Sequence, residues 1–181
     1  PMFSTMARLL YGCGLRLGEA LRLKVSDIKL SENIIQVKHT KNNTSRIVGI
    51  SGSLSSYIKN YIEKLSLNND CLLFSVRNGK EMSQSFVRKY FKQFYSKANI
   101  YNFLGKTPRV HDLRHTYAVH SLQNMIKQKM DIYCSLPYLA SAMGHKHIST
   151  TEKYLRLVED NFLNVKLDNI DNIFKGVNIY E

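Results

Sequence analysis

The sequence predicts an α+β domain that is mostly α-helical and carries one small antiparallel β-sheet. Through most of the 181 residues, apolar side chains recur at intervals of three and four, which is the helical pattern. The period becomes strand-like around 34–50, where two short apolar runs flank the turn-rich segment HTKNNT. An apolar content of 44% in a chain of this length is enough for one domain with a real hydrophobic core.

In the first half of the chain, we expect a helix that ends at the glycines of YGCG and a second helix over LGEALRLKV, residues 17–25. NIIQVK and SRIVGI then form a β-hairpin over 34–50. A helix is expected over 53–67, where apolar residues recur at helical spacing, and CLLFS at 71–75 is a candidate third strand.

The second half of the chain is predicted to be helical. The pattern indicates a helix over 83–99 that Ser83 caps, and another over 111–128. PYLASAMG forms a short helix that stops at Gly144, and STTEKYLRLVED opens with a Ser/Thr cap and an acidic first turn. Apolar residues from Leu163 to Val177 predict an amphipathic tail helix.

The charge of the chain is strongly basic, with 26 Lys and Arg against 14 Asp and Glu and a net charge of +12. Such an excess indicates a polyanionic partner, most simply nucleic acid, although a merely soluble basic protein is the plainer alternative. Residues 159–181 are instead acidic and would be repelled by DNA, so we expect them to bind protein. The predicted division is a body over 1–158 and a tail over 159–181.

Cysteine usage and hydropathy indicate a cytoplasmic protein. The three cysteines lie far apart and form no Cys-x-x-Cys pair, which argues against a disulfide framework and against a thiolate zinc site. No apolar run approaches the roughly 18 residues of a membrane span, and no signal peptide opens the chain, so no membrane association is expected. The chain begins abruptly in a helical pattern, as though an upstream segment were missing.

The stretch HDLRH at 111–115 raises the question of a metal site. His111 and His115 are four residues apart, the spacing at which two imidazoles on one helix face can share a zinc ion. However, Arg114 would place a cation beside the metal, and a zinc-protease helix needs Glu where this chain has Asp112. We therefore expect no metal and interpret the stretch as a clamp for phosphate.

Four short segments occur in a characteristic order: GLRLGE at 14–19, HTKN at 39–42, HDLRH at 111–115 and MGHKHISTTEKY at 143–154. Together they resemble the catalytic domain of the tyrosine recombinases, the phage-integrase family, over about residues 5–158. The insertion KQKMDIYCSLP, between HDLRH and MGHKH, resembles recombinases carried by mobile elements in Firmicutes. The family's N-terminal core-binding domain is absent from this chain, so the chain looks like an isolated catalytic fragment.

The resemblance implies a role for each matching residue. Tyr154 would be the nucleophile, which needs surrounding cations because a free phenol has a pKa near ~10. The residues implied to stabilise the phosphate are Arg16, His111, Arg114 and His145, and His111 would also assist proton movement at the tyrosine. Lys41 is the implied general acid for the leaving oxygen, with Lys38 as the competing candidate.

The remaining matches are interpreted as supporting residues. Glu19 and Asp27 resemble acidic positions that orient arginines or cap helices, so Glu19 is placed behind the residues that touch phosphate. His115 is placed there too, and with His120 it is expected to serve in packing or in a polar network rather than as a ligand.

The implied function is that of a site-specific recombinase that cleaves and rejoins double-stranded DNA through a 3′-phosphotyrosyl intermediate, to integrate or excise a mobile element. No cofactor is expected, because the phosphotyrosyl link conserves the bond energy. A C-terminal helix over 161–177 would dock in cis or in a neighbour, giving a homotetramer on DNA, and accessory directionality proteins are possible partners. Two alternatives stay open: relaxation of DNA by a type IB topoisomerase, and a non-catalytic helical DNA-binding regulator.

Overall fold

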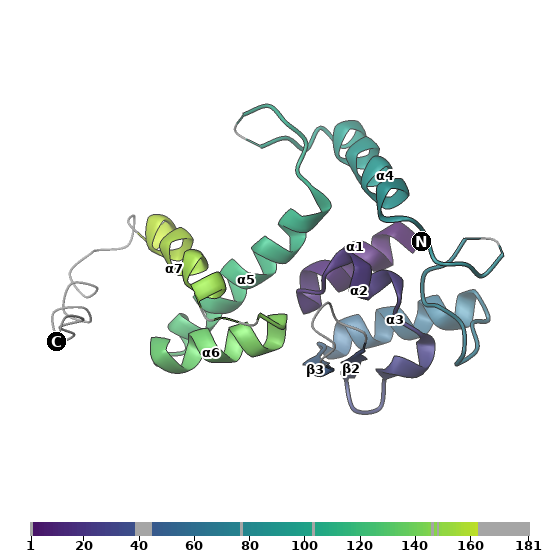
Figure 1. Cartoon of the computed structure of the whole chain (residues 1–181), viewed down its shortest axis with the longest axis horizontal. Coiled ribbons are helices and arrows are strands. Elements are labelled where there is room, and N and C mark those ends of the chain that lie inside the picture. The colour runs from purple at the N-terminus through teal and green to yellow at the C-terminus, as the bar shows by residue number, and fades with distance from the viewer. Residues whose placement is uncertain are drawn as a thin grey trace, which may run out of the picture.

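The computed structural model describes residues 2–38, 45–76, 78–102, 104–145, 147 and 149–162, with only the backbone described at 156, 157 and 159–162. Figure 1 shows α1–α3 and the small sheet on one side and α5–α7 on the other. The helices are α1 (Met2–Cys13), α2 (Leu17–Leu21), α3 (Gly52–Lys64), α4 (Gln84–Lys97), α5 (Val110–Lys127), α6 (Ile132–Met143) and α7 (Ser149–Phe162). The mostly helical α+β class predicted from sequence is therefore confirmed.

The sheet has three antiparallel strands, β1 (Ile28–Lys29), β2 (Ile34–Val37) and β3 (Arg46–Gly49), in that order. The predicted hairpin is confirmed, with Ile34 opposite Gly49 and Val37 opposite Arg46. The candidate strand at 71–75 is wrong, because within the described residues this segment makes only isolated bridges, such as that between Lys24 and Leu72. The third strand is β1 instead.

The second helix is shorter than predicted. It ends at Leu21, and the backbone then runs extended beside 71–73, where Leu73 N donates to Leu23 O at 2.8 Å and Val25 N donates to Cys71 O at 3.0 Å. The apolar residues Leu21, Leu23 and Val25 alternate with polar ones, which is the strand period rather than the helical one. A single 3₁₀ turn over Val25–Asp27 follows.

The helix predicted to start at Pro137 begins earlier, after Asp131, whose side chain accepts from Tyr133 N. Pro137 thus lies inside α6, and Gly144 ends the helix in the left-handed conformation at φ 66°. Helix α4 begins after Ser83, whose hydroxyl accepts from Phe86 N at 3.2 Å, as predicted. None of the described helices is both long and apolar enough to cross a membrane.

Two hydrophobic clusters form the interior. One unites α1–α4 and the sheet around Met6, Leu9 and Phe74, and the other unites α5–α7 around Leu122 and Leu139. Helix α5 packs against α1 as well as against α6 and α7, so it joins the two halves seen in Figure 1. Arg114 on α5 lies where the two clusters meet, since its guanidinium donates to Gly14 O on one side and to Met143 O on the other.

Gly14, between α1 and α2, allows a close approach at this junction. Its φ is 59°, and a Cβ there would lie 2.3 Å from Cδ1 of Tyr117 on α5. We expect Gly14→Ala to lower the free energy of unfolding by about 2–4 kcal/mol, because a left-handed backbone penalty adds to a steric overlap. Chemical denaturation measures this. Gly79→Ala is the matched control, since its φ is 75° with nothing within 4 Å; an equal loss in both variants would exclude the overlap with Tyr117.

Candidate active site

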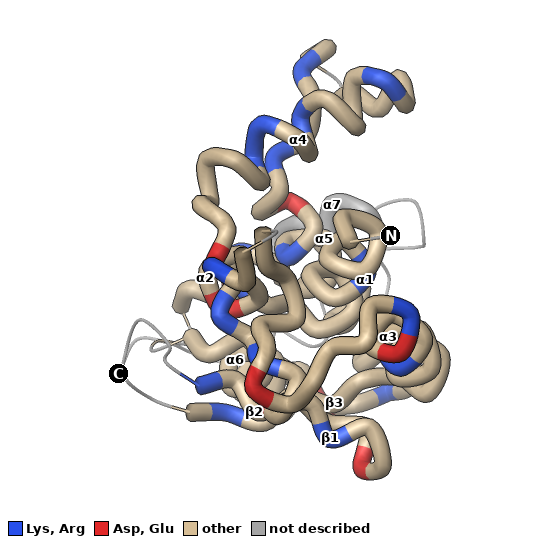
Figure 2. Tube along the Cα trace, turned by 90° about the vertical axis from the view of Figure 1, so that its right-hand side faces the viewer, with Lys and Arg blue, Asp and Glu red and all other residues tan. Residues whose placement is uncertain are grey.

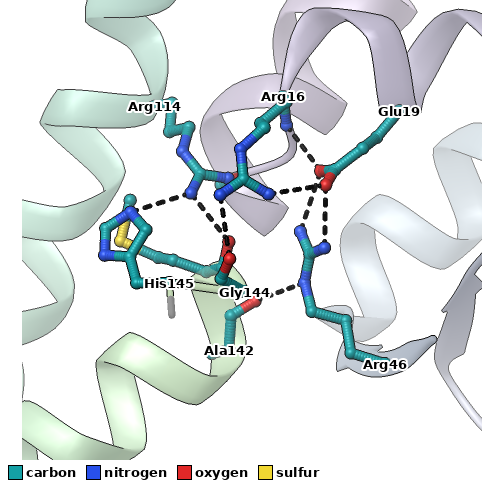
Figure 3. A network of polar contacts seen from close by, with 9 residues as sticks. Arg16, Glu19, Arg46, Arg114, Ala142, Gly144 and His145 are labelled. Atoms are coloured by element: carbon teal, nitrogen blue, oxygen red, sulfur yellow. Dashed lines mark hydrogen bonds and ion pairs between the residues drawn. The ribbon is translucent and has the colours of Figure 1, made fainter. Parts of the chain in front are cut away.

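The candidate site is assembled from segments far apart in the sequence. Arg16 precedes α2, Arg46 opens β3, Arg114 lies on α5 and His145 follows α6. Figure 3 shows Arg16 and Arg46 meeting at Glu19, the three arginines at the end of α6, and His145 beside Arg114. The structure therefore brings together three of the residues predicted for phosphate contact, Arg16, Arg114 and His145, and adds an arginine that the motif analysis did not select.

Glu19 is the anion at the centre of this network and is 4% exposed. Its Oε1 accepts from Nη1 of Arg16 and from Nη1 of Arg46, each at 2.9 Å, and its Oε2 accepts from Nη2 of Arg46 at 2.9 Å. Oε2 also accepts from the backbone N–H of Arg16 at 2.8 Å. Burial alone would raise the pKa of Glu19, but the hydrogen bonds from Arg46 and Arg16 and the charge of Arg46 lower the pKa to about 2. Glu19 is thus a fixed carboxylate that orients two guanidinium groups.

The C-terminal end of α6 holds three arginines through its carbonyl oxygens. Arg46 Nε donates to Ala142 O at 2.9 Å, Arg114 Nη2 to Met143 O at 2.7 Å, and Arg16 Nη2 to Gly144 O at 2.8 Å (Figure 3). The last carbonyls of a helix lack intrahelical partners and carry the negative end of the helix dipole. Three cations at this end therefore satisfy the carbonyls and are themselves stabilised.

Arg114 spans the junction between the two clusters and is only 2% exposed. Besides Met143 O, its guanidinium donates to Gly14 O, between α1 and α2. Burial, and then the neighbouring charge of Arg16, lower the pKa of Arg114 to about 10, while Glu19 opposes this shift. Arg114 consequently keeps its charge at neutral pH in a largely desolvated position.

His145 is a neutral imidazole with both nitrogens engaged. Its Nε2 lies 3.0 Å from Nη2 of Arg114, and its Nδ1 lies 2.8 Å from Oγ1 of Thr151. Because a guanidinium can only donate, Nε2 is the acceptor and the ring proton belongs on Nδ1. Burial, followed by the charges of Arg114 and Arg16, lowers the pKa of His145 to about 4.

Tyr154 is buried on the inner face of α7, with 3% of its surface exposed. Its ring is nearly parallel to that of His145, with 6.4 Å between centroids, and its hydroxyl lies 2.8 Å from Nδ1 of His115. Burial raises the pKa of Tyr154, and the charge of Arg114 offsets this in part. The resting side chain is therefore a phenol in a dry environment, with an imidazole on its oxygen.

The two histidines of HDLRH lie on one face of α5, with ring centroids 4.5 Å apart and the ring planes nearly perpendicular. His115 turns toward Tyr154, whereas His111 borders a groove. Burial is the main cause that lowers the pKa of both imidazoles. Across the described part of the chain, no group of three or more His, Cys, Asp or Glu side chains is placed to hold a metal ion. His120 bonds through Nδ1 with Tyr11 Oη at 2.8 Å, away from these residues.

The structure describes only one of the two candidates for the general acid, Lys38 and not Lys41. Lys41 falls in 39–44, outside the described residues, so its role stays a prediction. Lys38 forms an ion pair with the buried carboxylate of Asp27, with Nζ 2.5 Å from Oδ1. Asp27 also accepts from the backbone N–H of Lys24 at 3.0 Å and so caps the 3₁₀ turn. The pairing with Asp27 makes Lys38 a poorer donor to a substrate.

A basic groove of about 1240 Å³ borders the site between α2, α4 and the segment that leads into α5. Its lining includes Glu19 and six basic residues: Arg16, Arg22, Arg88, Lys92, Lys106 and Arg109. Figure 2 shows the corresponding blue segments along α4 and beside α2. With one acid among these cations, the groove favours a polyanion that extends away from Arg16 and His111.

Arg46 and Thr151 were missed as site residues, although the sequence contains a signal for each. Arg46 faces Val37 across the hairpin, and cross-strand partners share a face, so an arginine beside a buried valine requires an acidic partner. Thr151 precedes Tyr154 by three residues and Val158 by seven, which places all three on one helix face. Their burial agrees with that spacing.

We expect Glu19→Gln to destabilise the domain by about 3 kcal/mol, because it leaves Arg16 and Arg46 without their buried counter-charge. The melting temperature would fall by roughly 6–12 °C, measured by circular dichroism at pH 7. The pKa of Glu19 is depressed, so its contribution is present above the ordinary value near 4.5 and is lost as pH falls toward about 2.

The difference between wild type and variant should therefore shrink below pH 4.5. Glu63→Gln is the control, since its pair with Lys59 spans 3.9 Å at the surface. A variant as stable as the wild type would show that Glu19 does not hold the arginines.

Comparison with known proteins decides the family. The phage integrase family profile matches residues 3–160. The chain belongs to the phage integrase family. The resemblance predicted from the sequence is thereby confirmed. A Firmicute relative is among the matches. Tyrosine recombinase XerD of Staphylococcus epidermidis is 34% identical over 155 residues, which cover 83% of this chain and 48% of XerD. The chain thus spans about half the length of the curated relatives it matches.

Solved structures of a recombinase and a transposon integrase share the fold. The crystal structure of XerA recombinase matches with a TM-score of 0.69 and 24% identity, over 90% of this chain and 57% of XerA. A structure of the Tn1549 transposon integrase in complex with a circular intermediate DNA matches with a TM-score of 0.66 and 21% identity, over 83% of this chain and 52% of that one. At these sequence identities, the similarity to the two solved structures establishes the architecture of the chain and nothing further.

Proposed function

We propose that this chain is the catalytic domain of a site-specific tyrosine recombinase, which cleaves and rejoins double-stranded DNA through a 3′-phosphotyrosyl intermediate. The observation that carries the proposal is the placement of a buried tyrosine, Tyr154, beside His145 and Arg114, with Arg16 held on the same helix end. Membership of the phage integrase family supports it, as does similarity to a relative named as a tyrosine recombinase.

In the proposed reaction, the DNA backbone lies along the basic groove and places one phosphate beside Arg16 and Arg114. The Tyr154 oxygen attacks phosphorus, and negative charge grows on the non-bridging oxygens. Fixed guanidinium groups stabilise that charge without reorganising, which is the main source of rate enhancement in such sites. His111, which borders the groove, and His145 would add hydrogen bonds to the same phosphate.

The contacts that the arginines make in the absence of DNA already position them to bind a phosphate. Arg16 is already held by Glu19 and by the carbonyl of Gly144, and Arg114 by the carbonyls of Gly14 and Met143, so little side-chain entropy remains to be lost when phosphate binds. The negative charge of an arriving phosphodiester would also favour protonation of His145, whose pKa is low among cations. Lys41 is the proposed donor of a proton to the leaving 5′-oxygen.

We further propose that the protein integrates or excises a mobile element, since it is similar in fold to a transposon integrase whose structure contains a circular intermediate DNA. Double-stranded DNA is the proposed partner, and the cytoplasm the proposed compartment. Helix α7 continues to Phe162, past the boundary proposed at residue 158. Residues 163–181 lie outside the described residues, so the docking helix over 161–177, the homotetramer and the accessory proteins stay proposals.

The test uses nicked duplexes from the ends of the parent genetic element, designed so that cleavage releases a short fragment and cannot reverse. At low ionic strength, where phosphate contacts are strongest, the chain should form an SDS-resistant adduct with the DNA. Digestion and mass spectrometry should place the nucleotide on Tyr154. An adduct at another residue would contradict the site assignment. If no adduct forms at all, the result would favour a non-catalytic DNA-binding regulator. Relaxation of a supercoiled plasmid without such ends would instead favour a topoisomerase.

A further inference from the structure

The hydroxyl of Tyr154 has a specific neighbour that the phosphate contacts do not account for. Nδ1 of His115 on α5 lies 2.8 Å from the phenolic oxygen. The ring of His145 also lies against Tyr154, but both of its nitrogens are engaged, with Arg114 and with Thr151. Among the described residues, His115 is thus the imidazole whose nitrogen is placed on the nucleophilic oxygen.

We propose that His115 is a catalytic residue that accepts the phenolic proton of Tyr154 through Nδ1 during DNA cleavage and returns it during rejoining. This inference rests on the proposed function. In cleavage, the O–H bond of Tyr154 breaks, an N–H bond forms on His115, and the phenolic oxygen forms a bond to phosphorus. The bond from phosphorus to the leaving 5′-oxygen breaks, and that oxygen takes its proton from the general acid.

The positions of His111 and His115 indicate different roles for the two side chains. His111 borders the groove where the phosphate would lie, and its ring stands nearly perpendicular to that of His115 at 4.5 Å. Resemblance to the family had given proton movement at the tyrosine to His111. The contact geometry gives that step to His115 and leaves His111 to face the phosphate.

The surroundings of His115 keep it able to accept a proton. Burial lowers its pKa, and Arg109, Lys153 and Arg114 lower it further, while Asp112 opposes them. Apart from Asp112, the described groups around the ring are neutral or cationic: His111, Arg114 and Arg109 on or beside α5, and Tyr154 and Lys153 on α7. A neutral imidazole at neutral pH can take up a proton, as a general base requires.

The first experiment measures single-turnover cleavage of the nicked duplex by wild type, His115→Asn and His115→Ala. An asparagine can place an oxygen near the position of Nδ1 and accept the hydrogen bond, but it cannot take the proton. We expect both variants to cleave about 100-fold more slowly, the low end of what a general base contributes. His111→Asn serves as the comparison, because a variant that has lost only a phosphate ligand should keep the pH dependence of cleavage that His115 causes.

The second experiment distinguishes a defect at the attacking tyrosine from a defect at the leaving 5′-oxygen. A duplex with sulfur in place of the leaving 5′-oxygen has a leaving group that needs no protonation, so loss of the general acid is tolerated. Lys41→Ala should recover with this substrate, whereas the His115 variants should stay about 100-fold slow because their defect is at the nucleophile. The wild-type rate should also fall as pH drops through the pKa of His115, and this dependence should vanish in His115→Asn.

Three outcomes would overturn the inference. Cleavage by His115→Asn at the wild-type rate would assign His115 a hydrogen-bonding role only, and recovery of the His115 variants with the sulfur substrate would move them to the leaving-group side. A wild-type chain that forms no adduct would overturn the proposed function together with this inference, so the two failures are distinguishable. Circular dichroism of each variant, with His115→Gln as a second replacement, separates lost chemistry from lost folding.

Discussion

Tyr154→Phe is expected to form no covalent adduct with the nicked duplex, a loss of at least about 10⁴-fold in cleavage rate. The substitution removes one oxygen atom and therefore the nucleophile, while the ring that packs between His115 and His145 is retained. Loss of the hydrogen bond to His115 should change the free energy of unfolding by only about 1 kcal/mol. DNA affinity, measured by fluorescence anisotropy, should stay within roughly threefold, because no cation is altered.

Tyr138→Phe is the matched control. Tyr138 lies on α6 and is 65% exposed, so its side chain faces solvent rather than the buried arginine and tyrosine cluster. This variant should form the adduct at the wild-type rate. An adduct that survives Tyr154→Phe would mean that another group attacks phosphorus, and the proposed site would have to be abandoned.

Arg114→Lys is expected to slow cleavage by about 10³-fold although it preserves the positive charge. One ammonium cannot replace a fork that reaches Gly14 O, Met143 O and His145 Nε2 at once and still address a phosphate. Two buried carbonyls would also lose their donors, so we expect a loss of about 2–3 kcal/mol in stability. Single-turnover cleavage and chemical denaturation measure the two effects.

Arg8→Lys is the comparison for this charge-conserving exchange. Arg8 lies on α1, is exposed, does not line the basic groove, and has its guanidinium 4.6 Å from the centroid of the Tyr57 ring. Its replacement should change the rate by less than roughly threefold, because an exposed charge outside the groove is kept and contributes little. Equal rates for wild type and Arg114→Lys would show that only the charge at residue 114 matters, and the bidentate clamp would be disproved.

Much of the fold and of the candidate site could be predicted from the sequence, because these features depend on the spacing of residues that are close together in the chain. The three-residue interval from His111 to Arg114 and the helix stop at Gly144 indicate which side chains share a face and where the chain turns. The hairpin over 34–50 was equally local. Such features depend on neighbours within one turn or one hairpin, where period and turn chemistry decide the structure.

The parts that could not be predicted depend on contacts between distant segments. The end of α2 at Leu21 goes with pairing of residues 23–25 with 71–73. The alternation of Leu21, Leu23 and Val25 with polar residues indicates an extended segment but does not identify its distant partner. The contact between His115 and Tyr154 requires the packing of α5 against α7. Likewise, the role of Arg46 depends on Glu19, which lies 27 residues earlier, and on the end of α6.

The three carbonyls at the end of α6 also bear on how such a site could be moved to another scaffold. Copying Arg16, Arg46 and Arg114 alone would place three like charges together with only one carboxylate, and their side chains would splay toward solvent. The helix terminus supplies the missing acceptors from the backbone itself, so no mutation of a side chain can remove them. A designer would therefore have to transplant the last turn of α6 and Gly144 with the arginines, and build the arginine cluster as a helix end rather than as a set of residues.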